Sequence, residues 1–263
     1  MSDPSPAATL QRRGAVAIIT LNRPDALNAV NGALSTAVGT ALEDFGHDPE
    51  LQVAVITGAG RAFCAGADLK ALAAGDRIHA EGHEEWGFAG LVKHFVSKPI
   101  IAAVNGFALG GGTEIMLACD LAVLSEDAKL GLPEVKRGLA AAAGGLLRLP
   151  RQIPLKLALE VALTGAPIGA ATAARWGLVN RVVPADEVLA TAVGLAEQIA
   201  TNAPLSVRAS KRVIYRAADF GADFSDELWE MNADELRAVF RSADAKEGPQ
   251  AFAEKRAPRW QGK

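Results

Sequence analysis

Several residue types are scarce in this 263-residue chain, which has two cysteines, one tyrosine and 5% aromatic residues in all. Two cysteines cannot build a disulfide framework, so we expect Cys64 and Cys119 to be small buried side chains in a reducing compartment. No apolar run reaches the roughly 20 residues needed to span a bilayer. Residues 1–6 lack the basic start and apolar core of a signal peptide. We therefore expect a soluble, cytoplasmic protein.

Excess charge is also missing. The formal net charge is −3, which gives no electrostatic reason to expect nucleic acid or a membrane surface as a partner. Half of the residues are apolar and 22% are charged, which is ordinary for a globular protein and excludes an intrinsically disordered one.

Apolar strand patterns alternate with helical patterns in the first half of the chain, and helical patterns dominate the second half. The strand patterns are apolar throughout, as expected when helices cover both faces of a sheet. Residues 73–86 are polar and broken by glycine, and they carry no clear pattern. The sequence thus predicts an α/β fold with strands at 14–21, 51–57, 99–104, 120–125 and 180–183, and helices at 31–45, from about 68, and at 113–119, 155–163, 170–176, 187–201, 204–218 and 222–241.

Two glycine-rich turns come after apolar strands and carry the chemical argument. The first spans residues 61–70 and the second residues 105–114. Small residues between a strand and a helix let backbone N–H groups face a ligand, and two such donors at one oxygen form an oxyanion hole. Neither region is a phosphate loop. Gly58-Ala59-Gly60, just before the first turn, is no dinucleotide fingerprint because Phe63 stands where the third glycine should be, and Gly110-Gly111-Gly112 does not lead to the Gly-Lys-Ser/Thr of a P-loop.

These two turns, taken with a Leu-Pro-Glu motif later in the chain, resemble the crotonase superfamily. The resemblance rests on Ala62–Leu69, Pro99–Glu114 and Leu132-Pro133-Glu134, in the family's order and spacing. Asn22-Arg23-Pro24 with Asn28-Ala29, and Phe252 with Glu254-Lys255-Arg256, are similar to its terminal signatures. The resemblance implies a ClpP-like spiral of ββα turns over residues 1–200. A helical trimerisation region would occupy residues 201–263, with trimers usually paired into hexamers.

The resemblance also implies the roles of individual residues. The amides of Ala67 and Gly111 would form the oxyanion hole around a thioester carbonyl, and Glu114 and Glu134 would be the two catalytic acids. No metal and no separate cofactor are implied, since CoA arrives as part of the acyl-CoA substrate. The residues expected against CoA are Ala65, Ala67, Asp68, Leu69, Lys70 and Gly111.

The presence of both glutamates favours addition of water to a 2-enoyl-CoA, or its removal, over isomerisation. The segment 133–138 and the ending from Ser242 resemble carnitinyl-CoA dehydratases, specialised members that act on another acyl group. After Gly138, however, the chain reads Leu-Ala-Ala-Ala-Ala-Gly-Gly where hydratases of the family carry a Pro-Gly-Ala-Gly-Gly stretch. This departure leaves the acyl group open. A non-catalytic acyl-CoA-binding regulator is the alternative from another class.

Other candidate residues carry weaker signals. His79 and His83 flank Glu81, but zinc proteases need glutamate directly after the first histidine, so a solvated loop is the default. A serine hydrolase is disfavoured because no Gly-x-Ser-x-Gly elbow is present. Two questions stay open: whether Trp86, Phe88 and Phe95 line an acyl pocket or fill the core, and whether Lys211, Arg212 and Lys255 reach the CoA phosphates or are surface charges.

Overall fold

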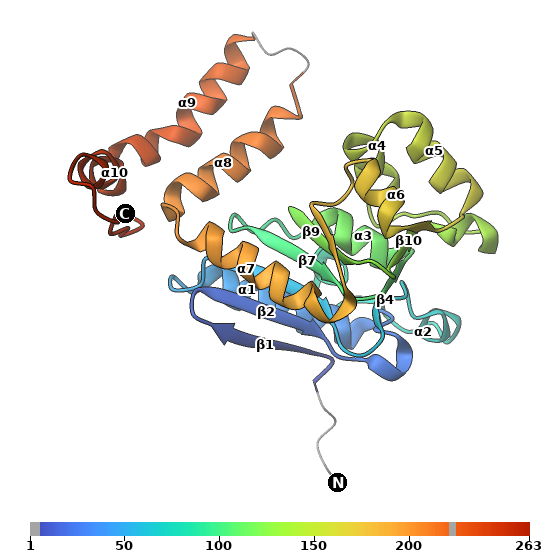
Figure 1. The fold of residues 1–263 in the computed structure, drawn as a ribbon. Coiled ribbons are helices and arrows are strands. Elements are labelled where there is room, and N and C mark those ends of the chain that lie inside the picture. The colour runs from blue at the N-terminus through green and yellow to red at the C-terminus, as the bar shows by residue number, and fades with distance from the viewer. Residues whose placement is uncertain (1–5, 221–224) are drawn as a thin grey trace.

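Two large sheets and the helices that cover them form the computed structural model, which describes residues 6–220 and 225–263 (Figure 1). The larger sheet has the order β1-β2-β3-β7-β9-β12, the smaller has the order β11-β10-β8-β4, and β5 and β6 form a separate pair. The strands are β1 (Ala8–Arg13), β2 (Val16–Leu21), β3 (Val53–Gly58), β4 (Ala62–Cys64), β5 (His79–Ala80), β6 (His83–Phe88), β7 (Ile100–Val104), β8 (Phe107–Leu109), β9 (Leu121–Ser125), β10 (Lys129–Gly131), β11 (Ile168–Gly169) and β12 (Arg181–Val183).

The α-helices cover these sheets and make up most of the C-terminal part. They are α1 (Gly32–His47), α2 (Leu69–Ala73), α3 (Gly111–Ala118), α4 (Gly145–Gln152), α5 (Leu155–Thr164), α6 (Ala170–Arg175), α7 (Val188–Ala200), α8 (Pro204–Ala217), α9 (Asp226–Arg241) and α10 (Asp244–Ala253). Short 3-10 helices are η1 (Pro24–Ala26), η2 (Pro133–Arg137) and η3 (Ala185–Glu187). No helix among the described residues is long and apolar enough to cross a membrane.

A repeated ββα unit builds the first half of the chain. In each unit one strand joins the larger sheet, a short strand joins the smaller sheet, and a helix comes next: β3-β4-α2, β7-β8-α3 and β9-β10-η2. The two sheets are parallel except at β1 and β11, which pair antiparallel with β2 and β10. The short strands β4 and β8 are neighbours in the smaller sheet, and each ends in one of the glycine-rich turns. The turns of successive units therefore lie in one region of the molecule.

Helices cover both faces of the larger sheet, as the apolar strands predict. Along β2, Ile19 belongs to the core cluster that includes Leu34 and Phe45 of α1, whereas Ile18 belongs to the cluster that includes Val193 of α7. Adjacent strand residues point to opposite faces, so an apolar run fills two cores at once.

The structure adds elements that the sequence patterns did not predict. They are β1, the short strands β4, β8, β10 and β11, the β5–β6 hairpin in the unassigned stretch, α4 and α10. The start of the helix predicted at 222–241 falls partly on residues 222–224, which lie outside the described residues, and the helix is described from Asp226. Helix α8 begins at Pro204, close to the predicted division at residue 200, and that division into two regions stays a prediction.

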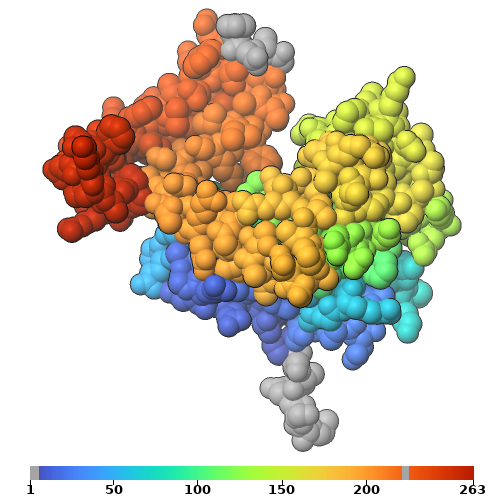
Figure 2. Space-filling view, viewed as in Figure 1, coloured from blue at the N-terminus to red at the C-terminus, as the bar shows by residue number. Residues whose placement is uncertain are grey.

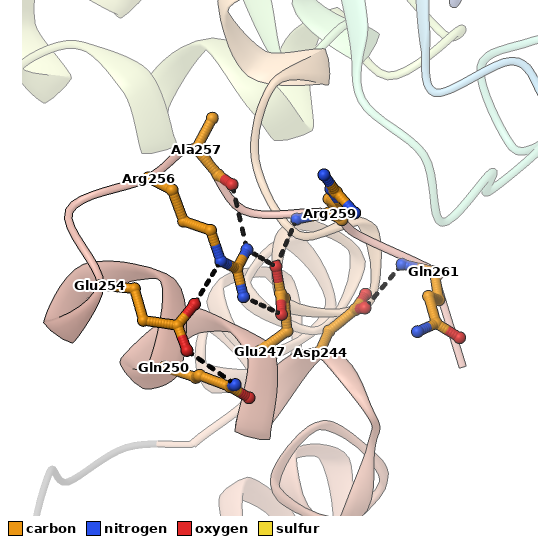
Figure 3. Close-up of polar contacts among 8 residues, drawn as sticks. All are labelled: Asp244, Glu247, Gln250, Glu254, Arg256, Ala257, Arg259 and Gln261. Carbon is orange, nitrogen blue, oxygen red and sulfur yellow. Dashed lines mark hydrogen bonds and ion pairs between the residues drawn. The ribbon is translucent and has the colours of Figure 1, made fainter.

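The C-terminal tail folds back onto α10 through largely buried acidic side chains (Figure 3). Glu247 accepts two hydrogen bonds from Arg256, at 2.6 and 3.0 Å, and these bonds hold the pKa of Glu247 down at about 2. Asp244 accepts from the amides of Gln261 and Gly262 at 2.7 and 2.9 Å. The tail thus closes α8–α10 into a unit that stands apart from α4–α6, with a notch between them (Figure 2).

Asp120 fastens this unit to the sheets. Its carboxylate accepts from Lys211 at 2.7 Å and from Tyr215 at 2.9 Å, both on α8, and from the Ile100 amide of β7 at 2.7 Å. The side chains of Asp120 and Lys211 are 15% and 10% exposed. Removal of one partner therefore leaves a poorly hydrated charge on the other.

We expect Asp120→Ala to lower the free energy of unfolding by about 3 kcal/mol, since it leaves the Lys211 ammonium without its carboxylate partner and the Ile100 amide without its acceptor. The matched control is Arg237→Ala, which breaks the exposed Arg237–Asp234 ion pair and should cost less than about 1 kcal/mol. Urea denaturation of both variants measures the difference. Equal losses in the two variants would contradict the role of Asp120.

Candidate active site

The first glycine-rich turn is held by the N-terminal segment 27–30. The Val30 amide donates to the Gly66 carbonyl at 2.8 Å, and the Asp68 amide donates to the Val30 carbonyl at 2.9 Å. Gly66 and Asp68 therefore both bond to Val30 in a parallel bridge, and Ala67 lies between them in the chain. The Ala67 amide points away from Val30 and has no acceptor among the described residues. The buried Asn28 side chain, which donates to the Ala62 carbonyl at 2.8 Å, fixes the strand that enters the turn.

The second turn approaches the first so closely that only glycine fits. Gly66 has φ +97°, and a Cβ there would lie 2.9 Å from the Leu109 carbonyl oxygen and 3.2 Å from the Gly111 nitrogen. A Cβ on Gly111 would overlap the Phe88 ring. Gly111 is the first residue of α3, so its amide has no intrahelical acceptor and lies at the positive end of the helix. Two unpaired amides from separate turns are thus brought together.

Glu114 lies one turn into α3 and is almost fully buried, at 3% exposed. Its Oε1 accepts from the Gly145 amide at 2.8 Å. Burial raises the pKa of Glu114 to about 7; the Gly145 hydrogen bond opposes this shift, and the nearby Glu134 carboxylate adds to it. A carboxyl group with this pKa can take up or release a proton near neutral pH.

Glu134 is the second residue of η2 and lines the same cavity as Glu114. Its Oε1 lies 2.9 Å from where a Cβ on Gly110 would stand, and its buried Oε2 has no hydrogen-bond partner among the described residues. Burial raises the pKa of Glu134 as well. The Thr113 hydroxyl ties α3, which carries Glu114, to β10, which leads into η2 and Glu134. It accepts from the Gly131 amide at 2.9 Å and donates to the Ala108 carbonyl of β8 at 2.6 Å.

A cavity of about 700 Å³ unites these groups, since Ala67, Gly111, Glu114 and Glu134 all line it. One wall comes from residues 78–93 and the facing wall from residues 139–151, which include the Ala-rich loop. The cavity therefore holds two unpaired amides and two carboxyl groups with raised pKa values in mainly apolar surroundings. That arrangement can stabilise charge on a carbonyl oxygen and move protons at neighbouring carbons.

Comparisons with known proteins agree with this geometry. The family model described as enoyl-CoA hydratase/isomerase matches residues 11–263. The chain belongs to this family. The crotonase superfamily and the ββα spiral that the motifs predict are both confirmed. The relatives are named as enoyl-CoA hydratases and carnitinyl-CoA dehydratases, which are hydro-lyases, so the predicted enzyme class is confirmed as well.

Three relatives illustrate the likeness. A carnitinyl-CoA dehydratase of Salmonella typhi is 46% identical over 259 residues, 97% of this chain and 98% of that protein. A solved enoyl-CoA hydratase of Mycobacterium tuberculosis H37Rv matches with a TM-score of 0.93 at 46% identity, over 98% of this chain and all of that one. A solved carnitinyl-CoA hydratase of Mycobacterium avium has 56% identity and a TM-score of 0.79, over 98% and 99%.

Four residues that the family resemblance places against CoA lie beside this cavity and do not line it. Asp68 caps α2 through the amides of Lys70 and Ala71, at 3.1 and 3.2 Å, and pairs with Arg23 at 3.0 Å. Burial acts to raise the pKa of Asp68, but the Ala71 and Arg23 contacts outweigh it and lower the pKa. Ala65, Leu69 and Lys70 complete the turn and the start of α2, and contact between these four residues and CoA stays a prediction.

The structure places most of the aromatic and basic residues in question, while contact of Lys211, Arg212 or Lys255 with CoA stays a prediction. Phe88 lines the cavity, whereas Trp86 stacks between two histidines and Phe95 stands 55% exposed beside Tyr215. Lys211 is engaged by Asp120, and Arg212 pairs with Glu235 at 2.6 Å. Cys64 and Cys119 are buried and unpaired, as predicted, and burial raises the pKa of Cys64 to about 12.

Two contributors to the site carry no signal in the sequence patterns. Gly145 donates to Glu114 from 31 residues away, and a Cβ there would lie 3.1 Å from the Glu114 Oε1. Arg148 donates to the Val92 carbonyl at 2.5 Å and so ties the two cavity walls together. Gly144-Gly145 marks the start of α4, but nothing local relates this pair to Glu114.

We expect Glu114→Gln to be more stable than the parent protein at pH 8 and to lose that advantage at pH 5. The folded state holds the Glu114 proton up to about pH 7, while an unfolded chain releases it near its ordinary value of 4.5. The parent therefore loses stability as pH rises between these values, by about 3 kcal/mol at 1.36 kcal/mol per pH unit. Urea denaturation at both pH values measures this, and a difference independent of pH would refute the buried-acid account.

Proposed function

We propose that this protein catalyses the reversible hydration of 2-enoyl-CoA thioesters to 3-hydroxyacyl-CoA. The observation that carries the proposal is the meeting of two unpaired amides and two protonatable carboxyl groups in one cavity. Family membership supports the CoA thioester as substrate. A non-catalytic binder has no need for two carboxyl groups buried together, since their burial costs stability at neutral pH.

The amides of Ala67 and Gly111 would receive the thioester carbonyl oxygen. When water adds to C3, negative charge moves onto this oxygen, and donors already in place stabilise it without reorganisation. The partial positive charge at the start of α3 adds to this effect. Loss of one such donor typically costs roughly 100- to 1000-fold in rate.

The glutamates would share one proton between them during the reaction. Glu114, oriented by the Gly145 amide, deprotonates the water that attacks C3, and Glu134 delivers its proton to C2. The unbonded Oε2 of Glu134 is free to face substrate. After hydration Glu114 carries the proton taken from water and Glu134 is ionised, so a proton passes from Glu114 back to Glu134, directly or through water, before the next turnover. Dehydration runs the same steps in reverse.

The charges on the cavity wall favour an uncharged acyl group. Lys93, Arg148 and Arg151 line the cavity, with Glu84 as the acidic side chain besides the two catalytic glutamates. A quaternary ammonium group, as in a carnitinyl chain, would meet more positive than negative charge on these walls. The names of the relatives described above nevertheless make carnitinyl-CoA dehydration the second candidate function.

Self-association through the C-terminal helices is part of the proposal. Ile214, Phe240 and Phe252 on α8, α9 and α10 are 71, 74 and 87% exposed, which is unusual for large apolar side chains outside an interface. The trimer or hexamer that the family resemblance implies would cover them. Cytoplasmic location likewise stays a prediction.

The direct test is a turnover screen with crotonyl-CoA, longer 2-enoyl-CoA and crotonobetainyl-CoA, monitored by loss of the enoyl thioester absorbance. We expect the uncharged substrates to be hydrated fastest. Glu114→Gln and Glu134→Gln should each lose at least about 100-fold in kcat yet still bind CoA thioesters. Near-normal turnover in either variant, or binding without turnover in the parent, would end the proposal.

The pH dependence should be the same in both directions of the reaction. Hydration starts with Glu114 ionised and Glu134 protonated, dehydration with the reverse, and these two forms carry the same number of protons. Above about pH 7 the pair loses its last proton, so kcat/KM should fall by up to tenfold per pH unit for both reactions. A kcat/KM that stays constant between about pH 6 and pH 9 would show that the reaction does not depend on a proton lost from the pair near pH 7.

A further inference from the structure

Residues 77–94, the wall segment, form one side of the active-site cavity but belong to neither large sheet. The segment contains the β5–β6 hairpin, whose strands pair only with each other. An isolated two-stranded hairpin is at best marginally stable in water. The wall segment must therefore be fixed by contacts with the rest of the protein.

One stripe of α1 supplies these contacts. The Gly32 amide donates to the Arg77 carbonyl at 2.9 Å, the Ser35 hydroxyl donates to the Ile78 carbonyl at 2.5 Å, and the Thr36 hydroxyl accepts from the Glu81 amide at 2.9 Å. Further along α1, Gly39 lies under the Trp86 ring, and Glu43 pairs with His94 at 2.7 Å. Spacings of three and four residues place all five positions on one face of the helix.

Trp86 is the centre of this attachment. Its ring is stacked between His83, with centroids 3.8 Å apart and planes 4° apart, and His94, with centroids 4.9 Å apart and planes 8° apart. A Cβ on Gly39 would overlap the Trp86 ring, so the ring rests directly on the helix backbone. His94 is in turn held by Glu43, which ties the stack to α1 at a second point.

The wall segment also touches the oxyanion-hole turn. Two residues after Trp86, the buried Phe88 ring occupies the space that a Cβ on Gly111 would need. Movement of Trp86 is therefore transmitted through β6 to the ring that packs against Gly111. Displacements of about 1 Å at such donors can cost on the order of 100-fold in rate.

We infer that Trp86 is a positioning residue: its stack between His83 and His94 on Gly39 of α1 holds Phe88 against Gly111 and keeps the Gly111 amide aimed at the thioester oxygen. The inference rests on the proposed function for its kinetic consequence alone. The contacts of the wall segment stand independently of it.

The test compares two alanine substitutions on the same helix in the full-length protein. Gly39→Ala displaces the Trp86 ring, whereas a Cβ on Gly46 would meet only Val96, at an ordinary 3.8 Å, so Gly46→Ala is the matched control. We expect Gly39→Ala and Trp86→Ala to lower kcat roughly 10- to 100-fold with KM changed far less, because the oxyanion contact acts mainly in the transition state. Trp86→Phe should keep most of the rate that Trp86→Ala loses, since a phenyl ring can still stack on His83 and His94.

Amide hydrogen exchange gives a second readout that needs no turnover. In Gly39→Ala, but not in Gly46→Ala, exchange should quicken both in residues 77–94 and at the Gly110 amide, which donates to the Gly131 carbonyl at 2.8 Å next to Gly111. Wild-type kcat in Gly39→Ala and Trp86→Ala, or faster exchange confined to residues 77–94, would overturn the inference. Should the parent protein hydrate no enoyl-CoA, the proposed function fails while the exchange at the Gly110 amide still decides whether Trp86 holds this turn in place.

Discussion

The close approach of two backbone turns at Gly66 and Gly111 is the contact on which the rest of the site depends. No side chain fits between them, so both amides can face the same small volume. Each turn is fixed from behind by an unrelated part of the chain: the first by Val30, the second by the β10 strand through Thr113. The geometry of the candidate site is thus a property of four separated segments, which explains why the family motifs are spread over so much of the sequence.

Burial raises the pKa of both glutamates, and this costs the folded protein stability at neutral pH. A carboxyl group beside apolar walls prefers to keep its proton, and one amide, from Gly145, partly offsets this for Glu114. The surrounding fold must therefore supply the stability that the site gives up. The fully apolar strands of the larger sheet, packed on both faces, are the natural source of it.

The sequence predicts those features that rest on local rules. Long apolar runs identified the central strands, and glycine clusters after them identified the turns, because close backbone approach tolerates little else. Strands such as Ala62–Cys64 and Phe107–Leu109 are three residues long and look like parts of the turns. The hairpin at 79–88 escaped prediction because its exposed face is polar and its stability comes from Gly39 and Glu43, about 40 residues earlier.

The candidate catalytic residues came from family motifs and not from periodicity. Alone, Glu114 reads as a favourable charge in the first turn of a helix, and Glu134 as the start of another. Nothing local indicates that Gly145 orients the first, or that Phe88 packs on Gly111. Contacts between distant segments are set by the three-dimensional arrangement, which single-sequence patterns do not encode.

Strand β1 has a consequence for how the protein behaves before it is fully folded. Parallel strands pair only after distant parts of the chain meet. During folding the backbone N–H and C=O groups of these apolar strands therefore stay unpaired for longer than those of a hairpin. The outer margin of the larger sheet is instead a local antiparallel ribbon ending in Arg12 and Arg13, both charged and exposed. A charged edge strand of this kind discourages another chain from adding a strand to it, and so protects the sheet from aggregation while it forms.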